Sequence, residues 1–272
     1  MKFVFCAIIT LLSAFSYASA GPPPLDITEV AAELSGITYK EPGMMKESGA
    51  MYGLSASYTK LSEPVWKIEA RLSTGLLTYH GAACDMTTGA CEPLTISGIK
   101  DNMFEVRGLL AAQPSDGPRS FQGLYFGLGY RYLYDGLNKG PGGYRRESNY
   151  YYLPVGFEGS FDTESEWTSG FVIEYDYFLH GRQISHQSDI NPGFNDLNNT
   201  QDSGYGLRGS LKFSKPLASG QGSIVIEPFI RRWKIQKSDM LQITYNGVPT
   251  GYVGYEPANN STEIGLRCSL RF

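Results

Sequence analysis

Residues Ser261 to Phe272, the last twelve of the chain, read STEIGLRCSLRF. From Thr262 onward, alternate positions are Thr, Ile, Leu, Cys, Leu and Phe, and the positions between them are Glu, Gly, Arg, Ser and Arg. Because successive side chains of a β-strand point to opposite faces of the sheet, this pattern predicts one strand with an apolar face and a charged face. The strand ends on an aromatic residue at the last position of the sequence.

The same alternation recurs along most of the chain. In residues 204–213, Leu207 and Leu211 share one face, and Arg208 and Lys212 share the other. Such segments are separated by turn residues, and no stretch has the periodicity of a strong amphipathic helix. The predicted strands are 29–41, 47–61, 64–79, 101–112, 120–136, 147–162, 166–184, 203–215, 222–237 and 261–272, about ten in all.

The connections between these strands alternate in length. Short ones are 62–64, 113–119, 162–165 and 215–221, and longer ones are 81–100, 137–146, 184–202 and 238–260. Transmembrane β-barrels have short periplasmic turns and longer external loops, so the rhythm predicts this architecture. The first external loop, 42–46, would be unusually short. If that hairpin is misassigned, the barrel has eight strands.

The first twenty residues have the composition of a secretory signal peptide. Lys2 is followed by an apolar run from Phe3 to Phe15 and by a small-residue ending at Ala20. The run is too short to span a membrane comfortably, which makes a helical anchor the weaker alternative. We expect cleavage after Ala20, export of the chain, and a single barrel domain that covers residues 21–272.

The charged face of each strand is expected to point into the barrel. A Lys or Arg on the lipid face costs about 2–4 kcal/mol near the membrane midplane. Tyr, Phe and Trp gather at the ends of the apolar face, as they do in interfacial girdles. A soluble barrel of lipocalin type would reverse the two faces, but the many glycines and paired opposite charges on the charged face favour a polar interior. The sequence therefore predicts an all-β fold, a closed antiparallel transmembrane β-barrel.

By its signal peptide, strand rhythm and terminal aromatic strand, the chain resembles the OmpA-like and opacity-type small outer-membrane barrels of bacteria. The resemblance covers nearly all of the chain, at the level of pattern. It implies a bacterial outer-membrane location and contact with outer-membrane lipids. It also implies that Leu270 and Phe272 form the signal recognised by the barrel-assembly machinery.

Acids and bases are nearly balanced on the predicted inner face. In a small barrel the interior is barely wider than its side chains, so these groups should pair across strands. The network can be a polar core that holds the barrel shut or the lining of a narrow passage, and the first interpretation is favoured. Its predicted members are Glu69, Arg71, Glu105, Arg107, Arg131, Glu158, Glu174, Asp176, Arg208, Glu227, Arg231, Glu263 and Arg267. Arg182 also falls on the inward parity.

One strand departs from simple alternation. Arg231 and Arg232 are adjacent, and Trp233 and Ile235 follow them on the parity opposite to Ile230. A β-bulge at the two arginines would restore the apolar face. The alternative is a regular strand, with Arg232 and Lys234 lying above the membrane.

Two cysteines lie close together in the second external loop. Cys84 and Cys91 are separated by six residues, and an exported protein matures where disulfides form. We predict a disulfide between them; a metal pair is the weaker alternative, because no His or third Cys lies nearby. Cys268 is expected to face lipid.

Candidate catalytic residues are few. His80, His180 and His186 fall near the external ends of their strands. Outer-membrane proteases of the omptin type also place His and Asp at an external rim, but their acidic pair and Asp-x-His arrangement are missing here. His180 follows Asp176 by four residues and is expected on the same face of the strand, but a rim His is more often an ordinary polar loop residue. The Asp- and Asn-rich segment 188–202 lacks the spacing of a calcium loop, and the sequence predicts no cofactor or metal site.

The sequence favours a non-enzymatic surface protein, whose external loops contact a ligand or another surface. The alternative is a narrow, porin-like channel for small solutes, and a hydrolase acting on peptides or lipids at the rim is less favoured. The formal net charge of −4 provides no basic surface for nucleic acid.

Overall fold

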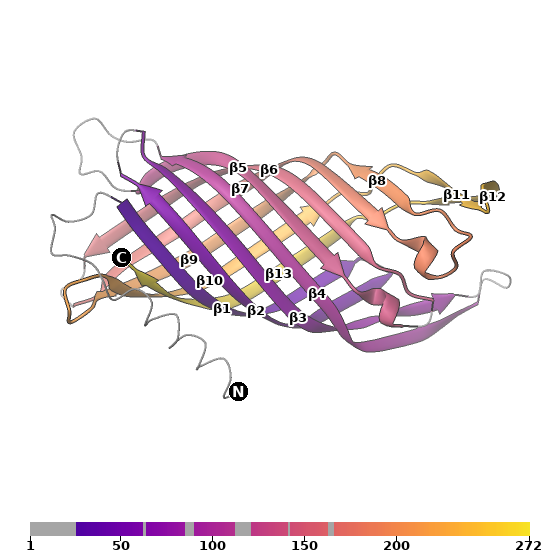
Figure 1. The fold of residues 1–272 in the computed structure, drawn as a ribbon, viewed down its shortest axis with the longest axis horizontal. Coiled ribbons are helices and arrows are strands. Elements are labelled where there is room, and N and C mark those ends of the chain that lie inside the picture. The colour runs from indigo at the N-terminus through magenta and orange to yellow at the C-terminus, as the bar shows by residue number, and fades with distance from the viewer. Residues whose placement is uncertain (1–25, 62–63, 85–89, 112–120, 141, 163–165) are drawn as a thin grey trace.

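The computed structural model describes residues 26–61, 64–84, 90–111, 121–140, 142–162 and 166–272. They form a long antiparallel β-barrel, whose strands are strongly tilted (Figure 1). Among the described residues, no helix has the length and apolarity to span a membrane. The predicted signal peptide, residues 1–20, lies outside the described residues, so its cleavage stays a prediction.

Ten strands form the wall, which confirms the main prediction and not the eight-stranded alternative. Each strand pairs with the next along the chain, and β13 pairs with β1 to close the barrel. The wall strands are β1 (Asp26–Glu41), β2 (Met45–Lys60), β3 (Trp66–Cys84), β4 (Cys91–Ala111), β5 (Gly123–Asp135), β6 (Arg146–Asp162), β7 (Thr168–Ser185), β9 (Gly204–Pro216), β10 (Ser223–Ile235) and β13 (Asn259–Arg271).

We call the barrel end near Phe272 periplasmic and the opposite end external, following the usual orientation of such barrels. The first hairpin does close through a very short external turn, in which Gly43 has φ +80°. Smaller elements extend the external end. They are the 3-10 turns η2 (Leu137–Lys139) and η3 (Gln187–Asp189), strand β8 (Leu197–Gln201), and the hairpin of β11 (Leu241–Tyr245) and β12 (Val248–Gly254).

The prediction of a long loop at 81–100 is wrong. Strands β3 and β4 continue as a two-stranded ribbon until Cys84 pairs with Cys91. Gly98, with φ +72°, is the extra residue of a bulge where the pairing passes from Leu77–Ile99 to Thr78–Ser97. A left-handed glycine fits such a bulge, which keeps the ladder continuous beyond the barrel wall.

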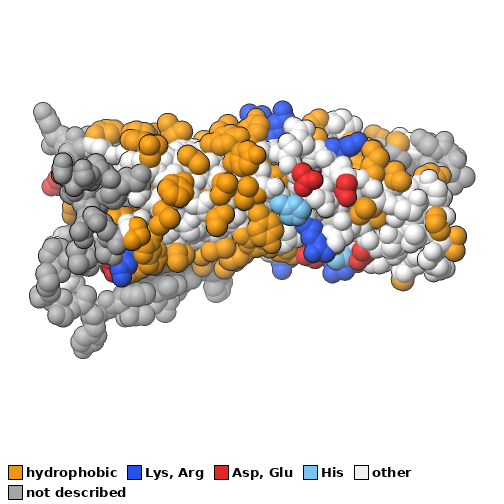
Figure 2. Space-filling model, turned by 90° about the horizontal axis from the view of Figure 1, so that it is seen from above, with side chains coloured by type: hydrophobic (Ala, Val, Ile, Leu, Met, Phe, Trp, Pro, Cys, Tyr) orange, Lys and Arg blue, Asp and Glu red, His pale blue; other side chains and the backbone are white. Residues whose placement is uncertain are grey.

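The apolar faces point outward, as predicted. Leu72, Leu128 and Ile173 expose 60%, 64% and 64% of their surface, and similar side chains cover one half of the barrel's length (Figure 2). Next to this apolar band, toward the external end, lies a belt of charged and His side chains. The arrangement suits a membrane-spanning band with charges above it, and contradicts the soluble-barrel alternative.

Two expectations about strand parity are wrong. Leu179 is an unpaired bulge residue of β7, because Tyr152 pairs with Phe178 and Tyr151 pairs with His180. The bulge turns His180 and Arg182 outward, away from the face that carries Asp176. Strand β10, in contrast, has no bulge at its arginines.

The register of β10 is regular from Phe229 to Ile235, so its side chains alternate without interruption. Arg231, Trp233 and Ile235 therefore point inward, and Arg232 and Lys234 point outward. This outcome matches the alternative given for this strand, in which the two outward bases lie beside the external charged belt.

Inward glycines leave room for large aromatic rings. A Cβ at Gly129 would overlap the ring of Tyr152, and one at Gly156 would overlap the ring of Tyr125. A glycine facing a ring on the neighbouring strand lets a barrel of this size hold bulky side chains. These glycines therefore make space for packing inside the barrel.

Candidate functional site: the barrel interior

Glu33 of β1 is the centre of a first group of buried charges. Its carboxylate accepts hydrogen bonds from Arg71 Nε at 2.6 Å, Arg267 Nε at 2.9 Å and Arg231 Nη1 at 3.2 Å. Arg71 also bonds to Glu263 of β13. Three arginines from three strands thus surround one carboxylate, and charge-assisted bonds of this kind are among the strongest in proteins.

A second group joins β4, β7 and β9. Arg208 Nε lies 2.7 Å from Asp176 Oδ2 and 2.9 Å from Glu174 Oε1, and its other nitrogens bond to Glu105. The hydroxyl of Tyr152 donates to Glu105 Oε1 at 2.8 Å. Asp176 is fully buried, so Arg208 provides the charge that compensates it.

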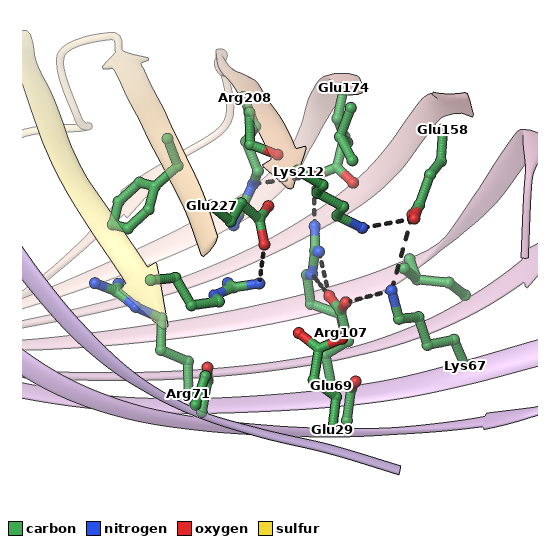
Figure 3. Close-up of a pocket in the computed structure, with 18 of the residues that line it drawn as sticks. Glu29, Lys67, Glu69, Arg71, Arg107, Glu158, Glu174, Arg208, Lys212 and Glu227 are labelled. Atoms are coloured by element: carbon green, nitrogen blue, oxygen red, sulfur yellow. Dashed lines mark hydrogen bonds and ion pairs between the residues drawn. The ribbon is translucent and has the colours of Figure 1, made fainter. Parts of the chain in front are cut away.

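A third group lies toward the periplasmic end (Figure 3). Lys67 Nζ is 3.0 Å from Glu69 Oε1, and Lys212 Nζ donates to Glu158 Oε1 at 2.6 Å. Between these side chains lies a cavity of about 80 Å³, room for several waters. Arg107 connects this group to the second by bonding to both Glu69 and Glu174.

The structure places all the residues predicted for the network on the inner wall. Each forms an ion pair with another inward side chain, except Arg131, which has no ion pair among the described residues. Its guanidinium lies 5.2 Å from the ring centre of Trp233, and its Nε has no hydrogen-bond partner among the described residues.

A belt of apolar side chains separates this network from the external end of the barrel. Tyr150, Tyr152, Phe178, Trp233 and Ile235 form one buried cluster on β6, β7 and β10. A second cluster on β1 to β4 consists of Ile37, Met51, Leu77 and Met103, and both clusters pack against Leu133 of β5. Apolar side chains therefore narrow the described interior at this level, and a cavity of about 50 Å³ lies against them.

Beyond the belt, a further set of charged side chains lines what we call the mouth: Glu41, Glu47, Asp101, Asp135, Arg146 and Glu256. Arg146 donates to Asp135 Oδ2 from Nε at 2.9 Å and from Nη2 at 2.7 Å, and it also bonds to Glu41. The hydroxyl of Tyr39 donates to Glu256 Oε1 at 3.0 Å. Burial raises the pKa of Glu256, which lies in the connection between β12 and β13 outside the membrane-spanning strands, to about 7.

Sequence reasoning missed the mouth. Glu41 follows Glu33 on the same parity of β1, and this was the available signal. The alternation of β1 continues beyond the apolar band, so its inward parity reaches the mouth.

The rim histidines are not arranged for catalysis with Asp176. His186 lies between two carboxylates, with Nδ1 3.0 Å from Asp196 Oδ2 and Nε2 3.0 Å from Glu147 Oε1. His180 is outside the barrel, 3.4 Å from Asp202, whereas Asp176 is inside. These contacts occupy both ring nitrogens of His186 in this structure.

The cysteines keep their predicted places. The backbones of Cys84 and Cys91 are directly paired, which brings Cα atoms within the range of a disulfide. The side chain of Cys84 lies outside the described residues, so the disulfide stays a prediction. Cys268 is exposed on the outer face, which confirms its predicted orientation.

The last strand closes the barrel close to the end of the chain. Phe272 N donates to Thr28 O at 2.8 Å, and Thr28 N donates to Phe272 O at 3.0 Å. Leu270 lies between Val30 and Ile224 of the neighbouring strands. The role of Leu270 and Phe272 as an assembly signal stays a prediction.

No family model matches the sequence, and no curated protein gives a significant match. Solved structures with a similar fold include the outer membrane protease OmpT from Escherichia coli, with 12% identity, a TM-score of 0.52, and coverage of 93% of this chain and 98% of OmpT. The translocator domain of the autotransporter NalP from Neisseria meningitidis has 12% identity, a TM-score of 0.40, and coverage of 98% and 94%.

OprG, an outer membrane protein from Pseudomonas aeruginosa, has 11% identity, a TM-score of 0.32, and coverage of 93% and 98%. These neighbours are bacterial outer-membrane barrel proteins, in agreement with the resemblance found in the sequence. The likeness to OmpT concerns the fold.

Proposed function

We propose that this protein is a non-enzymatic surface protein, whose external hairpin β11–β12 contacts a ligand or another surface. The observation that carries the proposal is the apolar character of this hairpin. Val248, Tyr252 and Val253 expose 65%, 56% and 51% of their surface, and their hairpin lies at the far external end of the barrel (Figure 1). Exposed apolar and aromatic side chains outside the membrane are typical of contact surfaces.

The narrowed interior supports the same proposal. The apolar belt and the ion-paired network leave a cavity of about 80 Å³ near the periplasmic end, and barrels of this size tend to be packed. That cavity is also the observation that favours the alternative, a narrow channel for small solutes. Planar-bilayer recordings separate the two: we expect a silent bilayer, and reproducible discrete openings would favour the channel.

A rim protease is the third hypothesis, since OmpT is an outer membrane protease. The outward position of His180 and the two carboxylates that bind His186 speak against it. We expect no peptide hydrolysis by the purified protein. Hydrolysis that is lost in His186→Ala would overturn this expectation.

The contact proposal is tested on whole cells that display the protein. The triple variant Val248→Ser, Tyr252→Ser, Val253→Ser should reduce retention of the cells at a hydrocarbon–water interface and reduce cell–cell aggregation. Ile190→Ser is the matched control, because Ile190 is a 45% exposed apolar residue of another external loop. Equal behaviour of the triple variant and the unmodified protein, at equal surface amounts, would contradict the proposal.

A further inference from the structure

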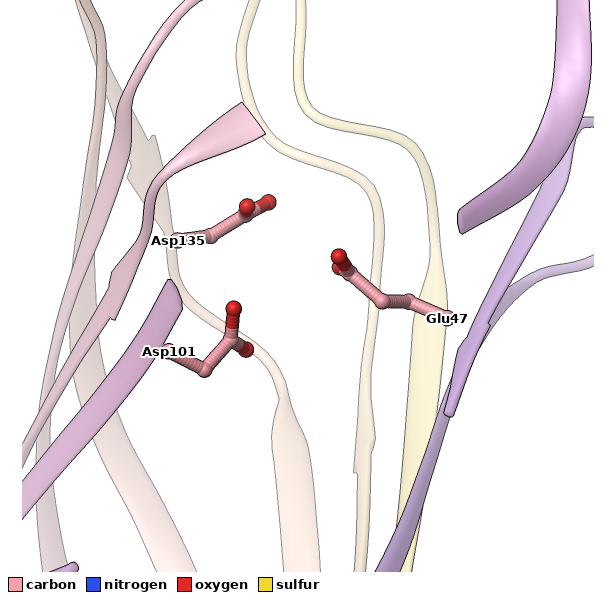
Figure 4. A group of neighbouring side chains, drawn as sticks. All are labelled: Glu47, Asp101 and Asp135. Carbon is pink, nitrogen blue, oxygen red and sulfur yellow. The ribbon is translucent and has the colours of Figure 1, made fainter. Parts of the chain in front are cut away.

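Three carboxylates converge in the mouth from strands that are not all neighbours. Glu47 of β2, Asp101 of β4 and Asp135 of β5 point toward one another, and each offers an oxygen within 4.8 Å of the other two (Figure 4). Strand β3 lies between β2 and β4, so the curvature of the barrel brings the side chains together. Like charges at this separation repel unless a proton or a cation lies between them.

The three carboxylates also have oxygens that accept no hydrogen bond within the described part of the chain, which is independent of their charge. Glu47 is 2% exposed, and its Oε1 has no hydrogen-bond partner among the described residues. Asp101 Oδ1 and Asp135 Oδ1 are likewise buried without a partner. Buried polar atoms are nearly always hydrogen-bonded, so three unpartnered acceptors in one cluster call for a compensating group, which can be a proton, a water or a cation.

The neighbouring base does not fill this position. Arg146 binds the other oxygen of Asp135 and the carboxylate of Glu41, and thus compensates acids at the side of the cluster. A cavity of about 50 Å³ adjoins the cluster, and Glu47, Asp101 and Asp135 line it together with apolar side chains of the belt. It has room for an ion together with waters that would complete a coordination shell.

From these contacts we propose that Glu47, Asp101 and Asp135 bind a divalent cation of the calcium class in the mouth of the barrel. All the ligand atoms are carboxylate oxygens, the donors that hard cations prefer. Ca²⁺ accepts irregular shells of six to eight oxygens, whereas Mg²⁺ demands a near-ideal octahedron, so three carboxylates from three different strands suit Ca²⁺ better. The site ties β2 to β4 and β5 where the wall passes into the external extension.

The test is calcium binding to protein purified from outer membranes in detergent and stripped with a chelator. Titration calorimetry should show one site with a dissociation constant of about 10⁻⁴–10⁻³ M, the range of extracellular calcium modules. Terbium luminescence excited through nearby Tyr134 and Trp233, which line the same cavity, should give the same stoichiometry.

The variant Glu47→Gln, Asp101→Asn keeps the shape of the ligands and removes two charges. It should weaken calcium binding by roughly tenfold or more, since calcium affinity follows the number of charged ligands. Asp202→Asn is the matched control: this acid is external and 77% exposed, and the variant should bind like the unmodified protein. Heat-dependent gel mobility reports whether each variant is folded.

Two results would overturn the proposal. One is the absence of binding by the unmodified protein up to millimolar calcium, which would leave shared protons as the compensation. The other is equal binding by the folded double variant, which would place the ion elsewhere, for example on co-purified lipid. Because the unmodified protein alone can give the first result, the test does not depend on folding of the variant.

Discussion

Below the apolar belt, the carboxylates of the interior are bound by arginine and lysine; above it, the described carboxylates of the mouth gather around Arg146. Glu33 accepts bonds from three arginines, whereas Glu47 keeps an unpartnered oxygen at similar burial. The comparison shows that burial alone does not decide what an acid does. A paired carboxylate is part of the core, and an unpaired one is available to a ligand.

Arg208→Met should cause the largest loss of stability, because it removes a base from the ion-paired network below the apolar belt. It would leave Asp176, which is fully buried, without its bonded base and remove a partner of Glu105 and Glu174. Removing one partner of a buried pair destabilises a protein by about 3–5 kcal/mol. Urea unfolding in detergent micelles, followed by heat-dependent gel mobility, measures the change.

Arg182→Met is the control for Arg208→Met. Arg182 is exposed on the outer face and bonds to Asn198, so its loss should change the unfolding free energy little. The addition of Asp176→Asn to Arg208→Met should recover part of the stability. If Arg208→Met unfolds at the same urea concentration as the unmodified protein, the pairing is not what stabilises the interior.

The next largest change in the free energy of unfolding should come from pH. Its source is Glu256, an acid of the mouth. The folded-state pKa of Glu256 is about 7, above its ordinary value of 4.5, because the side chain is buried. The folded protein therefore holds this proton more tightly than the unfolded chain does. The contribution of Glu256 to stability should fall as pH rises from about 4.5 to about 7, by up to roughly 3 kcal/mol at 1.36 kcal/mol per pKa unit.

Glu256→Gln isolates this contribution. The free energy of unfolding, measured in calcium-free buffer, should decline less between pH 5 and pH 8 for the variant than for the unmodified protein. Glu166→Gln is the control, since Glu166 is 78% exposed at the other end of the barrel and should leave the decline unchanged. An identical decline in Glu256→Gln would remove Glu256 as its source.

Much of this fold could be predicted from alternation. Ten strands, their outward apolar faces and the inward position of residues such as Arg71 and Glu174 follow from a period of two and from the cost of a charge in lipid. The bulge at Leu179 could not be predicted, because the pairing with β6 decides its position.

The contacts between interior side chains could not be predicted from the sequence either. Which acid meets which base depends on register and curvature, so the sequence predicts a balanced network without its pairs. The acids of the mouth were missed for the same reason. Glu47, Asp101 and Asp135 are far apart in the chain, and they meet across β3, which lies between two of their strands.

Glu47→Gln should stabilise the folded protein, whereas Arg208→Met destabilises it, and the change should be smaller. Two carboxylates within 4.8 Å of each other repel by at least about 3 kcal/mol when both are ionised and the effective dielectric constant is 20, and lost attraction to Arg146 offsets part of the gain. In calcium-free buffer at pH 8 the variant should be more stable by roughly 1–2 kcal/mol. Millimolar calcium should reverse the order, by stabilising the unmodified protein alone. A loss of stability in calcium-free buffer would mean that Glu47 has a partner and is not a free ligand.

The smallest effect on the barrel should come from the predicted disulfide, because it lies beyond both regions of the comparison. The backbones of Cys84 and Cys91 pair at the outer end of the β3–β4 ribbon. The double variant Cys84→Ser, Cys91→Ser should loosen this end and change the barrel's free energy of unfolding by no more than about 0.5 kcal/mol. Protease digestion of intact cells should cut the variant at this end faster than the unmodified protein. Mass spectrometry after alkylation provides the direct measurement: both thiols should be blocked in the unmodified protein, while Cys268 reacts once detergent replaces lipid. Free alkylation of the two loop thiols would show that pairing of the strands alone holds the ribbon together.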